Sequence, residues 1–555
     1  MACEPRQAAH EVEARPRSAS GWRHRWGWAA TLLLAVAVVW LMAGLRPDAF
    51  YCGDSGVKLI AARNAIRHPE RPLAVDLPRV GSRAVAGALD PFFVAHGDHA
   101  HAVQSPLFPV LSAPLLSLFG LRGLYVLPAL SFVAWLPLIA VLRRQLAPEA
   151  SPVMAGVVAA LASPLFFYGL EFWEHAPAAT ALGISTALAF ATCWPRAALW
   201  AAGAVGGLAM LLRPEAAWYV VALAGVVVAD RRRLDHLVWL AAGLTLVLGL
   251  WVLYNVWHFG TLTGPHVGAN LSALGTDWIA MRGRLVGTWL VPASAAGRLA
   301  LAAIAVAWIG WFASRRSRWW SSVALAAGIV LATLAAVGGA LNQESVWQAC
   351  PAACLACVPV VGRSRGAWRL LVLAGVSIGG VLLTANNDGG AQWGPRYLLI
   401  ASPAVMLLAA RSATSILESR RLVSSVLVVA ILAGAAFVSR RAYAELRGTK
   451  RYYGRIVDTM REQAAPGVYV VSDLWWFDQV TASLYGRNTT LYVRPDANGA
   501  AVFDDLRRAG VHRVVVARGQ AESAPGRFWE MAGCTVEDRA AIKERQMEFL
   551  VVGCR

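Results

Sequence analysis

Charged side chains are scarce in this chain: Asp, Glu, Lys and Arg make up 15% of its 555 residues. Soluble domains usually carry about 25%. Apolar runs of roughly 15 to 20 residues recur as far as about residue 438, and each approaches the ~20 residues that a helix needs to cross a bilayer. A soluble core could bury one or two such runs but not a dozen. The composition therefore excludes a soluble protein and predicts a polytopic, α-helical membrane protein.

Acidic residues are also few, at 33 against 51 Lys and Arg, which gives a net charge of +18. In a soluble protein this excess would suggest a nucleic-acid partner. Here the arginines lie in short loops between apolar runs, as do Arg231, Arg232 and Arg233, and no basic stripe alternates with aromatic residues. The pattern is typical of the positive-inside rule and excludes nucleic acid as a partner.

We predict about thirteen transmembrane helices between residues 28 and 438, with residues 1–27 as a cytoplasmic tail and no cleavable signal peptide. Alternation of sides then places the long loops 46–122 and 255–298 and the tail 440–555 on the outer face. The Pro-rich run 106–118 is too short for a span and is interpreted as an interfacial or re-entrant helix. The predicted spans are 28–45, 123–142, 152–169, 176–192, 197–212, 215–229, 236–254, 299–313, 321–337, 346–361, 368–384, 397–410 and 422–438.

The polar tail 440–555 predicts a small extracytoplasmic α/β domain. Strands are expected at 467–473, 489–494, 512–518 and 547–553, and a helix at 500–509. Cys534 and Cys554 fall in this tail. A disulfide between them is one alternative in an oxidising compartment, and two free thiols are the other.

Ionisable residues are nearly missing from the predicted spans, where an ion-coupled transporter needs them. Internal repeats, which are common in transporters, are missing as well. Polar residues gather in the outer loops instead. This favours chemistry at the outer interface, and a transporter or lipid flippase stays as the alternative function.

Ligand-type residues cluster in a predicted hairpin of the first outer loop, where 92–95 and 100–103 flank a turn. They are His96, Asp98, His99 and His101, and such side chains can hold a metal. No CxxC or HExxH signature accompanies them. We interpret the segment as a solvated turn, with a divalent metal ion as the alternative, and expect no other cofactor.

A second feature of this loop is the sequence Gly53-Asp54-Ser55-Gly56, which follows the first span and precedes Lys58. The flanking glycines let the backbone approach a ligand. We interpret Asp54 as a general base. The alternative is that Asp54 caps the helix expected over 55–67.

Three further outer segments carry candidate residues. A very short loop holds Glu171, Glu174 and His175, which are costly to leave unused beside lipid. Arg396 and Tyr397 lie at the mouth of the twelfth span, where the Arg396 fork can bind a phosphate or, alternatively, snorkel within an aromatic belt. Arg213 is a further phosphate ligand or, alternatively, the partner of Glu215 in a structural ion pair.

Taken in order, the motifs GDSG, SPLFPVLSAP, LRR, EFWEHAP, LLRPEA and WGPRYLL resemble the GT-C superfamily of membrane glycosyltransferases over residues 28–410. The branch they resemble is the protein-O-mannosyltransferase and lipid A aminoarabinose transferase type. The resemblance implies a bacterial inner-membrane enzyme with its active site on the extracytoplasmic side. Its donor would be a polyprenyl-phosphate-linked sugar, and its acceptor a protein, glycan or lipid. The family does not settle metal use.

The resemblance also implies roles for individual residues. An essential acid of the first outer loop maps onto Asp54, although the family often has a second acid where this chain has Ser55. Glu171 or Glu174 would supply the missing catalytic partner. The residues expected to bind substrate are Lys58, His175, Arg213, Arg396 and Tyr397.

Overall fold

The computed structural model describes residues 19–264, 277–290, 345–356, 364–418, 422–494, 499–519 and 528–554, with short gaps inside these ranges and a few isolated residues between 298 and 306. Residues 1–18 of the predicted cytoplasmic tail 1–27, most of the predicted span 299–313, the predicted span 321–337 and part of the predicted loop 255–298 lie outside the described residues.

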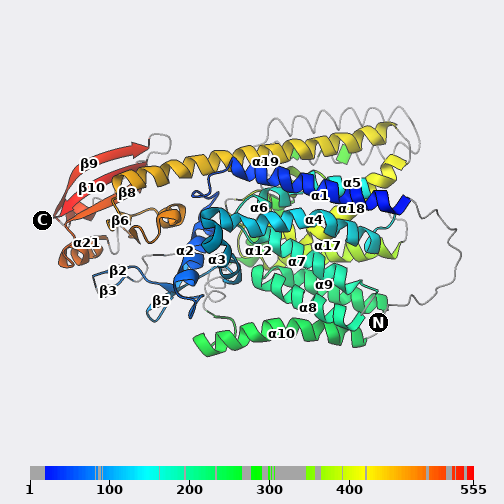
Figure 1. Cartoon of the computed structure of the whole chain (residues 1–555), viewed down its shortest axis with the longest axis horizontal. Helices are drawn as coiled ribbons and strands as arrows, with labels where there is room; N and C mark the ends of the chain where they lie inside the picture. Colours follow the sequence, from blue (N-terminus) through cyan, green and yellow to red (C-terminus); the bar gives the residue numbers. More distant parts are fainter. Residues whose placement is uncertain are drawn as a thin grey trace.

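Most of the described chain forms a bundle of apolar helices (Figure 1). Within the described part, five segments are long and apolar enough to cross a membrane: Leu107–Leu146, Pro195–Leu212, Asp235–Phe259, Arg365–Thr384 and Arg396–Glu418. Three shorter apolar helices join them. The protein is therefore a multi-pass membrane protein, and the count of thirteen spans stays a prediction.

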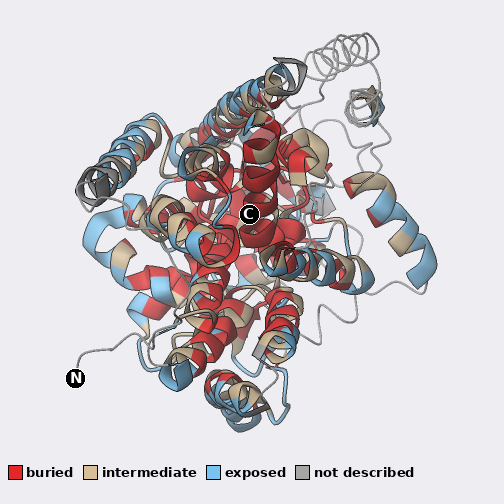
Figure 2. Ribbon diagram, turned by 90° about the vertical axis from the view of Figure 1, so that its right-hand side faces the viewer, coloured by how far each residue is buried: buried red, intermediate tan, exposed pale blue. Residues whose placement is uncertain are grey.

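The helices of the bundle match most of the predicted spans. They are α1 (Ala19–Ala43), α4 (Val126–Leu146), α7 (His175–Ala189), α8 (Pro195–Leu212), α9 (Ala216–Arg231), α10 (Leu234–Phe259), α17 (Arg365–Thr384), α18 (Ser402–Glu418) and α19 (Leu422–Gln463). A further helix, α12 (Trp278–Trp289), lies in the predicted outer loop 255–298, where no span was predicted. Buried residues gather in the centre of the bundle (Figure 2). Large apolar side chains such as Trp40 and Trp257 are exposed on its periphery, as expected for a lipid-facing surface.

Three predicted spans are not continuous α-helices. The run 152–169 breaks at Ser163 and Pro164, because proline cannot continue the backbone hydrogen bonding of a helix. The described part of 346–361 breaks in the same way at Pro351, and 397–410 opens with a 3-10 turn. The resulting pieces are α5 (Pro152–Leu161), α6 (Leu165–Gly169), α15 (Val346–Ala349), α16 (Ala353–Ala356) and η2 (Arg396–Ala401).

The Pro-rich run forms α3 (Leu107–Phe119), which packs on α2 (Gly53–Arg67). Gly120 has a φ of +59°, so the chain turns sharply into η1 (Gly120–Tyr125) before α4 begins. Gly123 lies so close to α3 that an added Cβ would overlap the Leu115 carbonyl. The helix α3 therefore folds back rather than running straight into α4.

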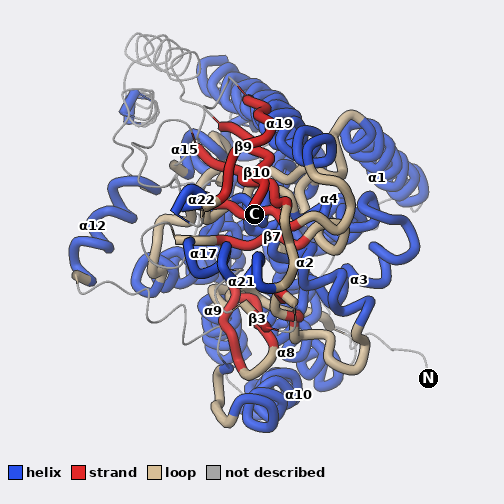
Figure 3. The backbone as a smooth tube through the Cα atoms, turned by 90° about the vertical axis from the view of Figure 1, so that its left-hand side faces the viewer, coloured by secondary structure: helices blue, strands red, loops and turns tan. Residues whose placement is uncertain are grey.

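The C-terminal region holds a five-stranded sheet with the order β7-β6-β8-β10-β9. Strands β6, β7 and β8 are parallel, whereas β10 pairs antiparallel with β8 and β9. The sheet lies at one end of the bundle (Figure 3). The elements are β6 (Tyr469–Ser472), β7 (Thr489–Tyr492), α20 (Phe477–Val480), α21 (Gly499–Arg508), β8 (Arg513–Gly519), α22 (Phe528–Met531), β9 (Cys534–Ile542) and β10 (Met547–Cys554).

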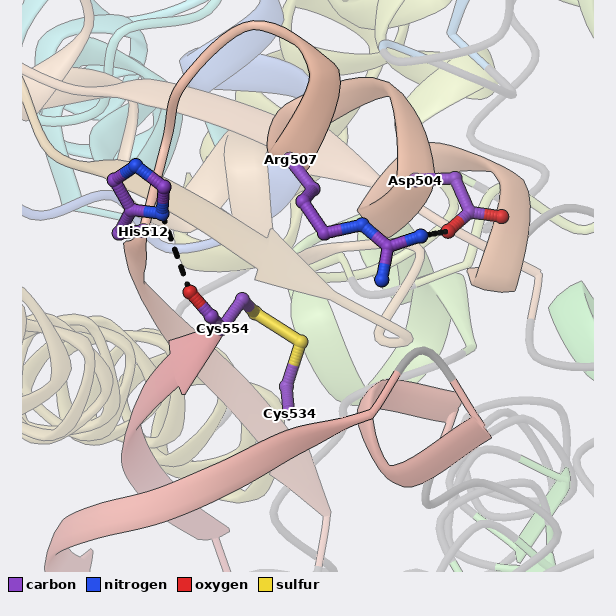
Figure 4. Close-up of a disulfide and its surroundings, with 5 residues drawn as sticks. All are labelled: Asp504, Arg507, His512, Cys534 and Cys554. Atoms are coloured by element: carbon purple, nitrogen blue, oxygen red, sulfur yellow. Dashed lines mark hydrogen bonds and ion pairs between the residues drawn. A yellow bond between two sulfur atoms is a disulfide. The ribbon is translucent and has the colours of Figure 1, made fainter.

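The four predicted strands and the helix of this domain are confirmed, and β9 is an additional strand. Most of its residues are exposed and several are charged, so it lacks the apolar signal of the other strands. A disulfide joins Cys534 to Cys554, and His512 Nδ1 donates to the Cys554 carbonyl at 3.3 Å (Figure 4). The disulfide alternative for these cysteines is therefore confirmed.

The helix α19 connects the two regions. Its 42 residues continue well past the predicted end of the span at 438 and run from the bundle to the sheet (Figure 1). The helices α2 and α3 lie between the bundle and the sheet in the same view. Segments predicted to share the outer face thus gather at one end of the molecule.

Candidate active site

The helix α2 begins earlier than predicted. Its N-cap is Cys52, with an extended backbone, and Asp54 lies within the first helical turn. No side chain caps this end by a hydrogen bond. The interpretation of Asp54 as an N-cap is therefore wrong, and its carboxylate serves another interaction.

That interaction is an ion pair with Arg396. Arg396 Nη1 donates to Asp54 Oδ2 at 2.7 Å, across 342 residues of sequence. The side chains are 11% and 19% exposed, respectively. The guanidinium carbon of Arg396 also lies 5.4 Å from the centre of the Trp173 ring. Trp173 and Trp393 are both buried, so the view of Arg396 as a snorkelling residue in an aromatic belt is wrong.

A second group of ion pairs lies near the first. Lys58, one turn after Asp54 on α2, contacts Glu174 Oε2 through Nζ at 2.7 Å. Arg213 Nη1 donates to the other oxygen of Glu174 at 2.9 Å. Arg213 Nη2 also donates to Glu215 at 2.8 Å, which confirms the ion pair weighed as the alternative for Arg213. Glu174 therefore bridges two cations.

Glu171 occupies a separate, sealed position. Its Oε2 lies 2.7 Å from Lys450 Nζ, and the two side chains are 0% and 1% exposed. The remaining polar contacts of the pair go to the Tyr51 amide, the Ser55 hydroxyl, the Ala49 carbonyl and the Tyr125 hydroxyl. This carboxylate is saturated by the protein itself.

His175 begins α7 and is buried between aromatic rings. Its ring centre lies 4.8 Å from that of Tyr168 and 5.4 Å from that of Trp173. Neither ring nitrogen has a hydrogen-bond partner among the described residues. A buried imidazole without partners marks a position where a ligand or water can bind.

The carboxylates of this site are held in their ionised form. Burial raises the pKa of Asp54, but the charges of Arg396 and Lys58 outweigh burial and keep that pKa below its usual range. Burial acts the same way on Glu174, and Lys58 with Arg213 still lowers its pKa to about 2. In this state Asp54 is anionic, paired and a weak base.

Comparison with known proteins identifies the fold. No family model matches the chain, and no curated protein matches it. A crystal structure of ArnT from Cupriavidus metallidurans bound to undecaprenyl phosphate matches with a TM-score of 0.54 and 14% identity, covering 96% of this chain and 98% of ArnT. The apo form of the same ArnT gives 0.50 and 13% over the same shares. The chain therefore shares the fold of this ArnT. The Archaeoglobus fulgidus oligosaccharyltransferase gives a TM-score of 0.49 and 13% identity, covering 88% of this chain and 69% of that one.

Within this fold, most predicted site residues lie together. Asp54 and Arg396 form one ion pair, and Glu174 pairs with both Lys58 and Arg213. The two groups are close enough for the charge of Lys58 to lower the pKa of Asp54. Tyr397 lies beside them, with its ring centre 5.1 Å from the guanidinium carbon of Arg213. His175 and Arg396 both lie next to the ring of Trp173.

The hairpin residues lie apart from these ion pairs. Strands β4 (Phe93–His96) and β5 (His99–Ala102) confirm the hairpin, and β5 also pairs with β1 (Val75–Asp76). The His96 and His101 ring centres are 6.2 Å apart, and burial lowers the pKa of His101 to about 4. Asp98 lies in the turn. Across the described ranges, no three His, Cys, Asp or Glu side chains are grouped to hold a metal.

Lys450, the buried partner of Glu171, is a residue next to the candidate site that sequence reasoning missed. It lies on the part of α19 beyond the predicted span 422–438, in a stretch expected to be a polar tail. A lone lysine there carries no distinguishing pattern. Only knowledge that α19 continues as one helix would have placed Lys450 beside Glu171.

Proposed function

We propose that this protein is a glycosyltransferase that moves a sugar from a polyprenyl-phosphate donor to an acceptor hydroxyl. The observation that carries the proposal is the partly exposed Asp54–Arg396 pair, a base beside a cation, in a GT-C fold. The ArnT structure with this fold contains undecaprenyl phosphate, which supports a lipid phosphate as the donor's carrier. The acceptor is a protein, glycan or lipid.

The donor phosphate binds Arg396. Its planar fork matches two phosphate oxygens, and its Nε has no hydrogen-bond partner among the described residues. Lys58 and Arg213 lie in the same network and supply further positive charge. The aromatic side chain of Tyr397 and the unpartnered imidazole of His175 line the position of the sugar.

In the reaction, Asp54 accepts the proton of the acceptor hydroxyl while the hydroxyl oxygen attacks the anomeric carbon. The bond between that carbon and the phosphate oxygen breaks, and the polyprenyl phosphate leaves with the electron pair. Its phosphate changes from one negative charge to two. Cations that contact it therefore bind the transition state more tightly than the ground state, which lowers the barrier.

Donor binding also activates the base. In the resting state Arg396 is the counter-ion of Asp54 and, with Lys58, keeps the pKa of that carboxylate low. An incoming phosphate takes over Arg396, so Asp54 loses part of this stabilisation and its pKa rises. The carboxylate becomes a stronger base only when a donor is present.

The other two acids support this chemistry. Glu174 is the second acid of the site and holds Lys58 and Arg213 in place for the phosphate. Glu171 accepts from the Tyr51 amide and the Ser55 hydroxyl. It thereby fixes the start of α2, next to Asp54.

The active site faces the extracytoplasmic side of a bacterial inner membrane. The sheet domain that contacts α2 contains the Cys534–Cys554 disulfide. Disulfides persist in oxidising compartments and are rare in the cytosol. This supports the outer placement of that end of the molecule and of Asp54 with it.

The test is to incubate purified protein in lipid nanodiscs with a panel of undecaprenyl-phosphate sugars and a membrane extract as acceptor. Release of undecaprenyl phosphate together with labelled product is expected from at least one donor. The Asp54→Asn variant should release none, whereas Asp98→Asn, an acid of the same loop outside the site, should match the wild type. Movement of the donor across the bilayer without cleavage would instead indicate a flippase.

A further inference from the structure

The first turn of α2 packs directly against α20 of the C-terminal domain. A Cβ added at Gly53 would overlap the Gln479 side chain, and one added at Gly56 would overlap the Gln479 main chain. The two glycines on either side of Asp54 therefore make room for a protein segment. The sequence interpretation, that they let the backbone approach a ligand, does not describe this contact.

A second contact holds α2 further along its length. Arg63, about one and a half turns after Lys58, donates to the carbonyls of Ala482, Ser483 and Tyr485 at 3.1, 2.9 and 2.7 Å. These carbonyls follow directly after α20 in the chain. The segment 477–485 thus contacts α2 at two places, its first turn and Arg63.

The chain that leads into α2 is tied to the same C-terminal region. Arg46 donates to Asp458 at 2.6 Å, and the Tyr51 hydroxyl donates to Glu445 at 2.7 Å. Both acids lie on α19, as does Lys450, the partner of Glu171. Contacts with α19 and with the segment 477–485 therefore determine where Asp54 lies. Its partner Arg396 belongs to a different element, η2.

Gln479 is built as a fixed element of this contact. Its side chain is 1% exposed, and its Nε2 donates to the Trp475 carbonyl at 3.1 Å. This hydrogen bond, to a residue in the turn that precedes α20, orients the side-chain amide that packs against Gly53. A side chain fixed in this way can transmit the position of α20 to the turn that carries Asp54.

We propose that Gln479 is a positioning residue for Asp54, and that the segment 477–485 of the C-terminal domain contributes to catalysis by holding α2 in place. This rests on the proposed glycosyl transfer. A small displacement of α20 would move Asp54 relative to Arg396 and to the bound acceptor. Misplacement of a reacting group by about 1 Å costs on the order of 100-fold in rate.

Two variants with different physical effects test the proposal. Gly56→Ala forces α20 away from α2, and Gln479→Ala removes the side-chain contact with Gly53 without a clash. Each should lower kcat roughly 10- to 100-fold with little change in the KM for the donor. Each should also move the acid limb of the kcat/KM profile to higher pH, because a displaced Asp54 pairs less closely with Arg396.

Matched controls are Gly448→Ala, on α19 with open space around it, and Gln463→Ala, at the end of the same helix. Both should keep wild-type kcat and pH profile. Normal kcat and pH profile in Gln479→Ala would overturn the positioning role, even if Gly56→Ala failed to fold. Wild-type protein that releases no undecaprenyl phosphate from any donor would instead overturn the proposed function.

Discussion

Two ion pairs at the same end of the molecule differ in their access to solvent. Asp54–Arg396 and Glu171–Lys450 both have a contact of 2.7 Å between nitrogen and oxygen. The side chains of the first pair are 19% and 11% exposed, whereas those of the second are 0% and 1% exposed. The second pair is surrounded by further hydrogen bonds from protein groups, whereas the Nε of Arg396 has no hydrogen-bond partner in the part of the chain that the structure describes.

This difference in exposure distinguishes a pair that a substrate can reach from a pair that stabilises the fold. A sealed and saturated ion pair has no room for a substrate, but breaking it leaves an uncompensated charge in the interior. A partly open pair can exchange one partner for an incoming ion. Asp54–Arg396 is therefore the pair that a phosphate can open, and Glu171–Lys450 is the pair that holds the surrounding segments together.

The largest effect expected from this comparison is on activity. Asp54→Asn keeps the size of the side chain but removes its basicity, so transfer should fall by at least about 1,000-fold. Thermal unfolding in detergent should stay close to that of the wild type. Substantial transfer by Asp54→Asn would remove Asp54 from the mechanism.

At the Glu171–Lys450 pair, the main effect of a substitution should be on stability. Lys450→Met leaves Glu171 buried without a counter-ion and should destabilise the protein by about 3–5 kcal/mol. Adding Glu171→Gln removes the unpaired charge and should recover much of this loss. Both are measured by thermal unfolding; a Lys450→Met protein as stable as the wild type would show that the pair is not structural.

The pH dependence should reveal the exchange of partners. Without donor, the pKa of Asp54 is below its usual range, so the carboxylate stays ionised and kcat/KM should fall only at pH values below that range. With donor bound to Arg396, the pKa rises, so the acid limb of kcat should lie at higher pH than that of kcat/KM. Coincident limbs would argue against the exchange.

The smallest predicted effect concerns a third carboxylate, Asp478, which has no Arg or Lys partner among the described residues. Asp478 of α20 is buried, the backbone amides of Asp478 and Gln479 interact with its carboxylate, and burial still raises its pKa to about 7. Since this folded-state pKa exceeds the unfolded value, stability is lost as pH rises between the two and stays lost above pH 7. Asp478→Asn should therefore raise the melting temperature by a few degrees at pH 8.5 and have little effect at pH 4. Equal effects at both pH values would contradict this.

The sequence analysis identified both Asp54 and Arg396 of the exposed pair, but of the buried pair it identified Glu171 and missed Lys450. Asp54 and Arg396 stand out because each lies at the outer end of an apolar run, and alternation of sides brings such ends together. Lys450 sits in a helix whose continuation beyond residue 438 has no apolar signature. Its contact with Glu171 depends on how far α19 extends, which local pattern does not determine.

The fold shows the same division. Long apolar runs predicted α4, α8, α10 and α17 because length and composition decide whether a helix can span a bilayer. Breaks at Pro164 and Pro351 were missed inside such runs, where hydropathy hides the effect of proline. The packing of Gly53 and Gly56 on Gln479 joins distant segments, so no local pattern could reveal it.

The most direct test of the central claim is an experimental structure of the protein in nanodiscs with undecaprenyl phosphate bound. The account predicts the phosphate on Arg396, with the Asp54 carboxylate separated from that guanidinium and turned toward the position of the acceptor. A phosphate bound elsewhere, with the Asp54–Arg396 pair still closed at 2.7 Å, would contradict it.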